Sequence, residues 1–170
     1  MDEPVEAVAG VLARQLDVRL AVAESCTGGL ISHLLTNVPG SSDYFLGSVI
    51  SYANQAKIHL LDVKPETLAI YGAVSRETVL EMARGVRQLL SADIGISVSG
   101  IAGPGGGTID KPVGTTWIGL SAVGLDRAWH FQFAGGRLEI KQQAAGMALN
   151  LVVDYLRQGI LDQSMPVQDG

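Results

Sequence analysis

The sequence predicts an α/β fold, a single three-layer α/β/α domain with a mixed β-sheet. Short apolar segments typical of buried strands alternate with segments whose apolar residues recur every three or four positions, as on one helix face. Two successive strand-type segments over 113–133 are separated by a glycine-containing turn, which indicates an antiparallel hairpin. The 170 residues contain no repeat or linker, and 47% are apolar, which is enough for one core.

In the first half, residues 4–16 carry an apolar helical face, and 20–23 is a short apolar segment typical of a buried strand. The turn residues at 39–42 separate the next predicted helix from the next predicted strand. The remaining predicted elements of this half are a helix over 27–36, a strand over 45–52, and short helices over 54–61 and 65–71.

In the second half, Ser75 is a typical N-cap for a helix that runs to about Leu90 with an apolar stripe. The next predicted elements are a strand over 94–98, a loop over 100–111, strands over 113–123 and 128–133, and a helix over 138–156. We assign residues 1–158 to the domain and expect residues 159–170 to form a loose C-terminal tail.

Composition excludes several partners and site types. The net charge is −5 and Lys and Arg do not cluster, which argues against binding to nucleic acid or to an anionic membrane. One cysteine is compatible with a reducing compartment, and the N-terminus shows no signal peptide. One cysteine and three scattered histidines have no metal-ligand spacing, so we expect no metal site. We expect a soluble, cytoplasmic protein.

The segment Ala23-Glu-Ser-Cys-Thr-Gly-Gly29 places Ser25 at a strand-to-helix turn. Backbone N–H groups at the start of the following helix can hold an anion or a developing oxyanion, and Gly28 and Gly29 let the backbone approach a ligand. The pattern is not G-x-S-x-G, so a nucleophile elbow is only an analogy. A helix N-cap serine followed by packing glycines explains this segment equally well.

A nucleophilic serine needs a base, because its hydroxyl is weakly nucleophilic at neutral pH. His33, His59 and His130 lie in a helix body, an apolar segment and a strand, and we expect them to be structural or exposed. The remaining candidate is Lys57, just past a predicted strand end, and it can act as a base only if burial lowers its pKa. An ordinary exposed helix lysine is the alternative.

Two further segments are candidates for ligand binding. The strand ending near Ser99 runs into a loop with five glycines between Gly100 and Gly107, whose N–H groups can cradle a phosphate. A flexible surface loop is the less favoured alternative, because so many glycines beside a strand end suggest close approach to a ligand. Arg137 precedes the last helix and could bind a phosphate or carboxylate, although alone it would be taken as a surface arginine.

Six segments in order carry a resemblance to a known family. They are Ala23–Gly29, Tyr52-Ala-Asn-x-x-Lys57, Gly72-Ala-Val-Ser75, Ser99-Gly-Ile-Ala-Gly-Pro104, Lys111-Pro-Val-Gly114 and the Gly-x-Arg at 135–137. In this combination the chain resembles, from about residue 5 to residue 157, the CinA C-terminal domain family, which includes nicotinamide-nucleotide amidases.

The resemblance implies hydrolysis of the carboxamide of nicotinamide mononucleotide to nicotinate mononucleotide and ammonia, without a metal or other cofactor. It places the nucleophile on Ser25 and the base on Lys57, with Tyr52 and Ser99 holding Lys57 or relaying a proton. The expected substrate-binding residues are Cys26, Thr27, Gly28, Gly29, Asn54, Gly100, Gly103, Gly105, Gly106 and Arg137. Ser99 stands where the family usually has threonine, and Gly136 where it often has aspartate.

Two alternatives stay open. The chain could be a regulatory module that binds a pyridine nucleotide or a phosphate without turnover, and Cys26 would be the nucleophile if Ser25 were dispensable. The high apolar content also suggests a homo-oligomer.

Overall fold

Within residues 3–164 the sheet has five strands and is mixed, as predicted. The computed structural model describes residues 3–164, with side chains described through residue 159. The strands are β1 (Leu20–Glu24), β2 (Phe45–Ile50), β3 (Ile94–Gly100), β4 (Thr115–Ala122) and β5 (Leu125–Gln132). Their order across the sheet is β2-β1-β3-β4-β5, with β2, β1 and β3 mutually parallel and β4 and β5 antiparallel.

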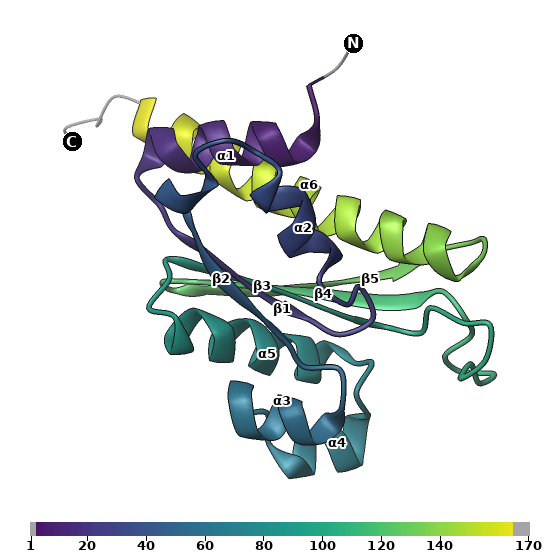
Figure 1. Cartoon of the computed structure of the whole chain (residues 1–170). Coiled ribbons are helices and arrows are strands. Elements are labelled where there is room, and N and C mark those ends of the chain that lie inside the picture. The colour runs from purple at the N-terminus through teal and green to yellow at the C-terminus, as the bar shows by residue number, and fades with distance from the viewer. Residues whose placement is uncertain (1–2, 165–170) are drawn as a thin grey trace, which may run out of the picture.

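Helices cover both faces of the sheet and make the predicted three layers (Figure 1). One face carries α1 (Val5–Leu16), α2 (Leu30–Thr36) and α6 (Arg137–Ser164). The other carries α5 (Arg76–Leu89), with α3 (Asn54–Leu61) and α4 (Pro65–Tyr71) packed beneath it. A single 3₁₀ turn at Ser41–Asp43 precedes β2. The fold class predicted from the sequence is therefore confirmed.

Strand β1 lies inside the sheet and contributes to both cores. Leu20 and Val22 pack into the cluster formed with α1, α2 and α6, whereas Ala21 and Ala23 pack toward α5. All five β1 residues are buried, which explains why this strand is a continuous apolar segment up to Glu24 rather than an alternating one.

Three element boundaries differ from the sequence prediction by three residues or more. Helix α2 begins at Leu30 rather than residue 27, because Gly28 and Gly29 have φ angles of +61° and +99°. The hairpin turn is Val123-Gly124, so β5 begins at Leu125 rather than residue 128. Helix α6 extends to Ser164 and takes in residues 159–164, which were predicted to be tail; residues 165–170 lie outside the described part.

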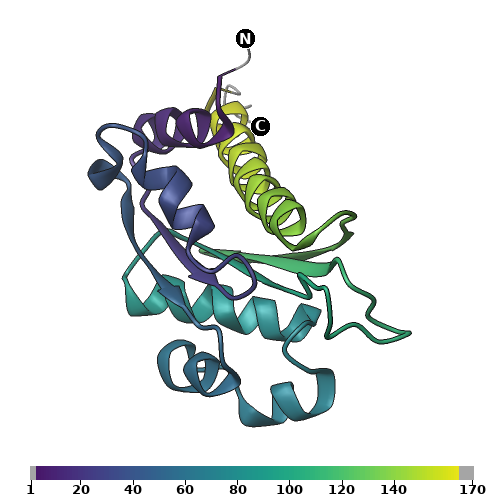
Figure 2. The ribbon, with the colours of Figure 1, turned by 45° about the vertical axis from the view of Figure 1, so that its right-hand side comes forward.

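The topology creates a crevice at the carboxyl ends of β1 and β3. The connection leaving β1 passes through α2 to β2, and the connection leaving β3 runs the opposite way to β4. Ligands of open α/β sheets bind where neighbouring strands send their chains in opposite directions, outside the carboxyl ends. The β3–β4 segment extends beyond the layers at this end (Figure 2), with Ile109 99% exposed.

Candidate active site

Ser25 is the first residue after β1, at the crevice. Its N–H donates to Val98 O at 3.0 Å, which ties the residue to β3, and the neighbouring Ser51 N–H donates to Glu24 O at 2.8 Å, which ties β1 to the end of β2. The serine is 8% exposed. Strand ladders on both sides therefore fix the backbone that carries this hydroxyl.

Lys57, from α3, meets Ser25 in the fold. Its Nζ donates to Ser25 Oγ at 3.0 Å and to Ser51 O at 2.7 Å, and the residue is 1% exposed. Burial disfavours the charged ammonium and lowers the pKa of Lys57 to about 8, from an ordinary 10.5. With this pKa about a tenth of the amine is neutral at pH 7. A neutral amine at this distance can accept the serine proton.

Cys26 lies beside this pair but is a poor nucleophile. Burial raises the pKa of its thiol to about 11, so the reactive thiolate is scarce at neutral pH. A Cβ on Gly100 would lie 2.6 Å from Thr116 Oγ1 and 3.1 Å from Cys26 Sγ, so this close packing requires glycine at position 100. The environment therefore favours Ser25 over Cys26.

A cavity of about 280 Å³ opens beside Ser25 and Lys57. Most predicted site residues line it: Ser25, Cys26, Tyr52, Asn54, Lys57, Ser99, Gly100, Gly103, Gly105, Gly106 and Arg137. Ala73 and Val74, before α5, also line it, and the sequence analysis assigned them no role. The β3–β4 loop is thus a wall of the cavity at Ser25, and its approach to a ligand stays a prediction.

Thr27, Gly28 and Gly29 do not line this cavity. They border a separate hollow of about 350 Å³, together with His33 and Lys141. The N–H of Gly28 donates to Ser25 O at 3.1 Å, and that of Gly29 donates to a Glu24 carboxylate oxygen at 3.0 Å. The N–H groups of Gly28 and Gly29 are thus used within the fold, and the contact of this segment with substrate stays a prediction.

Arg137 spans the mouth of the cavity at the start of α6. Its Nη1 donates to Gly103 O at 2.7 Å and its Nη2 to Tyr52 Oη at 2.9 Å. The Tyr52 hydroxyl thus contacts Arg137 rather than Lys57, to which only the Tyr52 carbonyl comes near, at 3.5 Å. A guanidinium has five N–H donors, so this one can still bind an anion at the mouth.

Ser99 lies in the cavity wall but its hydroxyl also does not reach Lys57. Its Oγ donates to Ala73 O at 2.7 Å and joins β3 to the segment before α5. The contact that orients the Lys57 amine instead comes from the carbonyl of Ser51. A backbone carbonyl leaves no signature in a sequence, so this partner could not be predicted.

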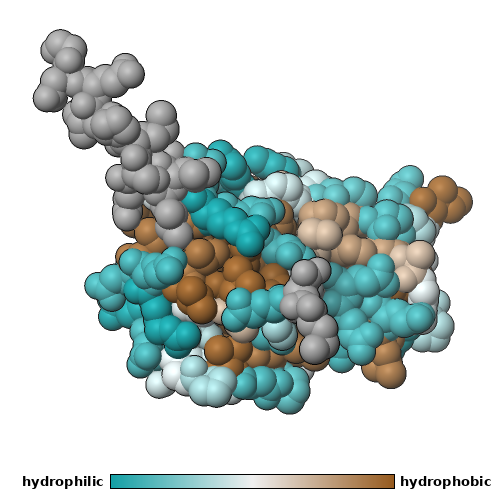
Figure 3. All heavy atoms as spheres, turned by 90° about the horizontal axis from the view of Figure 1, so that it is seen from above, coloured by the Kyte–Doolittle hydropathy of each residue, from teal (hydrophilic) through white to brown (hydrophobic). Residues whose placement is uncertain are grey.

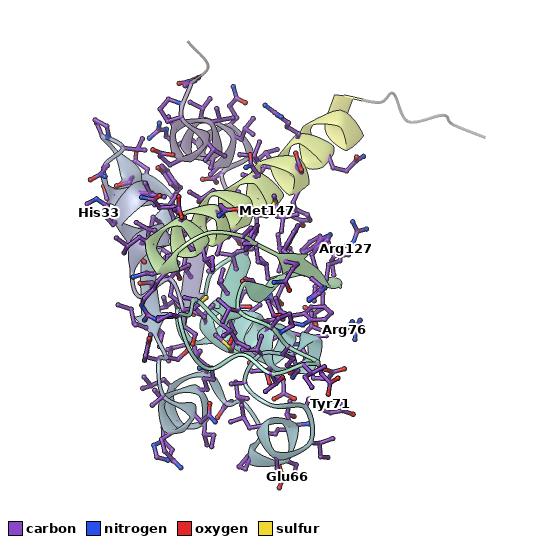
Figure 4. All side chains as sticks on the ribbon, turned by 90° about the vertical axis from the view of Figure 1, so that its right-hand side faces the viewer. His33, Glu66, Tyr71, Arg76, Arg127 and Met147 are labelled. Carbon is purple, nitrogen blue, oxygen red and sulfur yellow. The ribbon has the colours of Figure 1, made fainter. Side chains whose placement is uncertain are left out.

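The histidines lie away from the site. His33 is exposed on the outer side of α2 (Figure 4), and His59 and His130 are also exposed. His130 stacks obliquely on Trp117, with ring centroids 5.0 Å apart. None of the three lines the cavity at Ser25, which agrees with the prediction that they are structural or exposed. Within residues 3–164, no three His, Cys, Asp or Glu side chains gather as metal ligands.

The fold and site define a class: α/β domains that hold a serine hydroxyl against a buried lysine at the carboxyl ends of parallel strands. A model of the CinA C-terminal domain matches residues 2–156, and the chain belongs to this family.

Among relatives, a CinA-like protein of Thermotoga neapolitana is 46% identical over 157 residues, covering 92% of this chain and 38% of that protein. A CinA-like protein of Desulfosudis oleivorans is 60% identical over 117 residues, covering 69% and 28%. The chain thus spans well under half the length of these curated relatives.

Solved structures agree with the fold. A CinA superfamily protein from Klebsiella pneumoniae superposes with a TM-score of 0.88 at 32% identity, covering 91% of this chain and 96% of that one. The competence/damage inducible protein CihA from Agrobacterium tumefaciens superposes with a TM-score of 0.85 at 36% identity, covering 92% and 98%.

Proposed function

We propose that this domain is a serine amidase that hydrolyses nicotinamide mononucleotide to nicotinate mononucleotide and ammonia. One observation carries the reaction type: Ser25 Oγ lies 3.0 Å from the Nζ of a lysine that is 1% exposed and whose pKa is lowered to about 8. The substrate follows from the family resemblance of the motifs at 23–29, 52–57 and 99–104.

The first half-reaction forms an acyl-enzyme. The neutral Lys57 amine takes the proton of the Ser25 hydroxyl as Oγ attacks the carboxamide carbon. The resulting Lys57 ammonium donates this proton to the amide nitrogen, the C–N bond breaks, and ammonia leaves. Water then attacks the ester carbon, and Lys57 accepts one water proton and passes it to Ser25 Oγ as the ester C–O bond breaks. The released acid loses its remaining proton to solvent and leaves as the carboxylate.

The oxyanion needs a donor other than those at Gly28 and Gly29. Among the described residues of this turn, the N–H groups of Ser25, Gly28 and Gly29 donate within the fold, whereas those of Cys26 and Thr27 do not donate to another residue. Cys26 lines the cavity whereas Thr27 does not, so we assign the oxyanion donor to the Cys26 N–H. This is the N–H that follows the nucleophile, the arrangement found in α/β hydrolases.

We assign the phosphate of the substrate to the mouth of the cavity, beside Arg137. Arg137 is a cationic side chain at this mouth, and Gly103, Gly105 and Gly106 place backbone beside it without side chains. Binding energy from a remote phosphate can hold the carboxamide at Ser25.

The experiment is ammonia release from nicotinamide mononucleotide by wild type, Ser25→Ala and Lys57→Met. Both variants should lose turnover by at least about 10³-fold, as for other catalytic serines and their bases. Ser42→Ala and Lys64→Met, which change exposed residues, are the matched controls. Normal turnover by Ser25→Ala would reject the nucleophile assignment and point to Cys26. A wild type that binds the nucleotide without releasing ammonia would instead indicate a regulatory binding module.

We further propose that the protein works as a homo-oligomer in the cytoplasm. In support, the free Cys26 suits a reducing compartment, and apolar side chains form a patch among hydrophilic ones on the face seen in Figure 3. No helix in the described part of the chain has the length and apolarity needed to cross a bilayer. Light scattering coupled to size exclusion tests the assembly, and a monomeric mass at micromolar concentration would refute it.

A further inference from the structure

Glu24, the last residue of β1, is a fully buried carboxylate that the reaction above does not use. Its Oε2 accepts the N–H groups of Gly29 at 3.0 Å and Ile31 at 3.2 Å. Its Oε1 accepts the N–H of Ser32 at 3.0 Å and the Oγ of the same residue at 2.6 Å. Burying a carboxylate is costly unless it is fully hydrogen-bonded, and these four donors satisfy it.

These contacts make Glu24 the cap of α2, which has no N-cap side chain of its own. The backbone of Glu24 belongs to β1 and its carbonyl accepts the Ser51 N–H, while its side chain holds the first turn of α2. One residue thus anchors both ends of the turn 25–28. Ser25 follows directly, so the direction in which its Oγ projects depends on this anchor.

The same contacts explain why the helix start offers no anion site. The N–H groups of Gly29, Ile31 and Ser32 would otherwise be free and would attract the oxyanion or the phosphate of a ligand. Glu24 occupies them with an internal anion. A substrate anion is therefore left with the donors of the cavity at Ser25.

We propose that Glu24 is a positioning residue of this active site: its carboxylate fixes the turn so that Ser25 Oγ stays 3.0 Å from Lys57 Nζ. The inference rests on the proposed serine–lysine chemistry and adds a residue that touches neither substrate nor the reacting atoms. A displacement of about 1 Å in such a pair can cost about 10²-fold in rate.

The test compares Glu24→Gln with wild type. Glutamine keeps the shape but turns an NH₂ group toward donors that need an acceptor, so the turn must shift. We expect kcat for ammonia release to fall about 10²-fold with KM nearly unchanged, because only transition-state geometry is lost. The matched control is Glu81→Gln. Glu81 similarly accepts Lys64 N–H and Thr67 Oγ1, both at 2.8 Å, at the start of α4.

A second readout does not depend on the substrate. A fluorophosphonate probe phosphonylates reactive serines with loss of fluoride, and its labelling rate at Ser25, followed by mass spectrometry, should fall in parallel with kcat in Glu24→Gln but not in Glu81→Gln. If Glu24→Gln fails to fold, Ser32→Ala removes the 2.6 Å contact to Glu24, together with a 2.7 Å hydrogen bond between Ser32 Oγ and Ser48 Oγ, and should still slow labelling several-fold.

The outcomes separate the two proposals. A wild type that labels at Ser25 without releasing ammonia from the mononucleotide refutes the substrate, and labelling then still tests Glu24. Folded Glu24→Gln or Ser32→Ala that labels at the wild-type rate overturns the positioning role. An equal loss of labelling in Glu81→Gln would also overturn it, because capping a distant helix would then suffice.

Discussion

Burial of Lys57 should make the free energy of unfolding depend measurably on pH. The folded pKa is about 8 and the ordinary value is 10.5, so between these values the unfolded chain binds more protons than the folded one. The free energy of unfolding therefore rises with pH across this window. At 1.36 kcal/mol per pKa unit, the full cost below pH 8 is about 3 kcal/mol, of which about 2.5 kcal/mol disappears between pH 7 and pH 10.

The perturbation is Lys57→Met, which removes the charge and keeps a similar length. It also abolishes the hydrogen bonds to Ser51 O and Ser25 Oγ, but that loss hardly depends on pH and cancels when differences at several pH values are compared. Urea unfolding at pH 7, 8, 9 and 10 gives the variant-minus-wild-type difference at each pH.

Between pH 7 and pH 10, we expect the free energy of unfolding of the variant to fall by about 2.5 kcal/mol relative to that of the wild type. The control Lys64→Met removes an exposed lysine and should give a flat difference. Parallel wild-type and Lys57→Met curves would mean that Lys57 is not desolvated, and the reasoning for a neutral base would fail.

Three further results are expected. The kcat/KM for ammonia release should rise about tenfold per pH unit below pH 8 and level off above it, since the base is the neutral amine; a flat profile from pH 6 to 9 would contradict this. Arg137→Gln should lower kcat/KM for nicotinamide mononucleotide by about 10²-fold and leave that for the riboside nearly unchanged; equal losses would reject the phosphate contact. Gly85→Ala should destabilise the protein by about 1–3 kcal/mol in urea unfolding, because its Cβ would meet the main chain at Leu61 O; wild-type stability would show that α3 can shift away from α5.

Much of the fold was predictable because local patterns and tertiary packing agree. The buried strand at 20–23, the apolar stripe of 76–90 and the Ser75 N-cap all appear, with Ser75 Oγ accepting the Thr78 N–H at 3.2 Å. The errors fall at element boundaries, where a glycine with a positive φ or the absence of a helix breaker determines where the element begins or ends. Helix α6 continues through Gly159 because a single glycine does not end a helix.

The site was predicted less completely. Ser25, Lys57 and the loop glycines come together because the parallel strands β1, β2 and β3 all have their carboxyl ends on the same side of the sheet. This arrangement can be predicted from a sequence of alternating strands and helices. The roles of individual hydroxyls could not be anticipated, since Tyr52 Oη meets Arg137 and Ser99 Oγ meets Ala73 through tertiary placement. Glu24 stood in the recognised motif, but its burial and its four donors are visible only in three dimensions.

The order of residues along the chain has a consequence for biosynthesis. Ser25 and Lys57 both precede β3 and α6 in the sequence. The N–H of Ser25 is nevertheless held by Val98 of β3, and the mouth of the cavity is spanned by Arg137 of α6. A ribosome-bound nascent chain that has not yet released β3 lacks the strand that seats the nucleophile. The proposed serine–lysine pair is therefore seated only once β3 has joined β1 in the sheet.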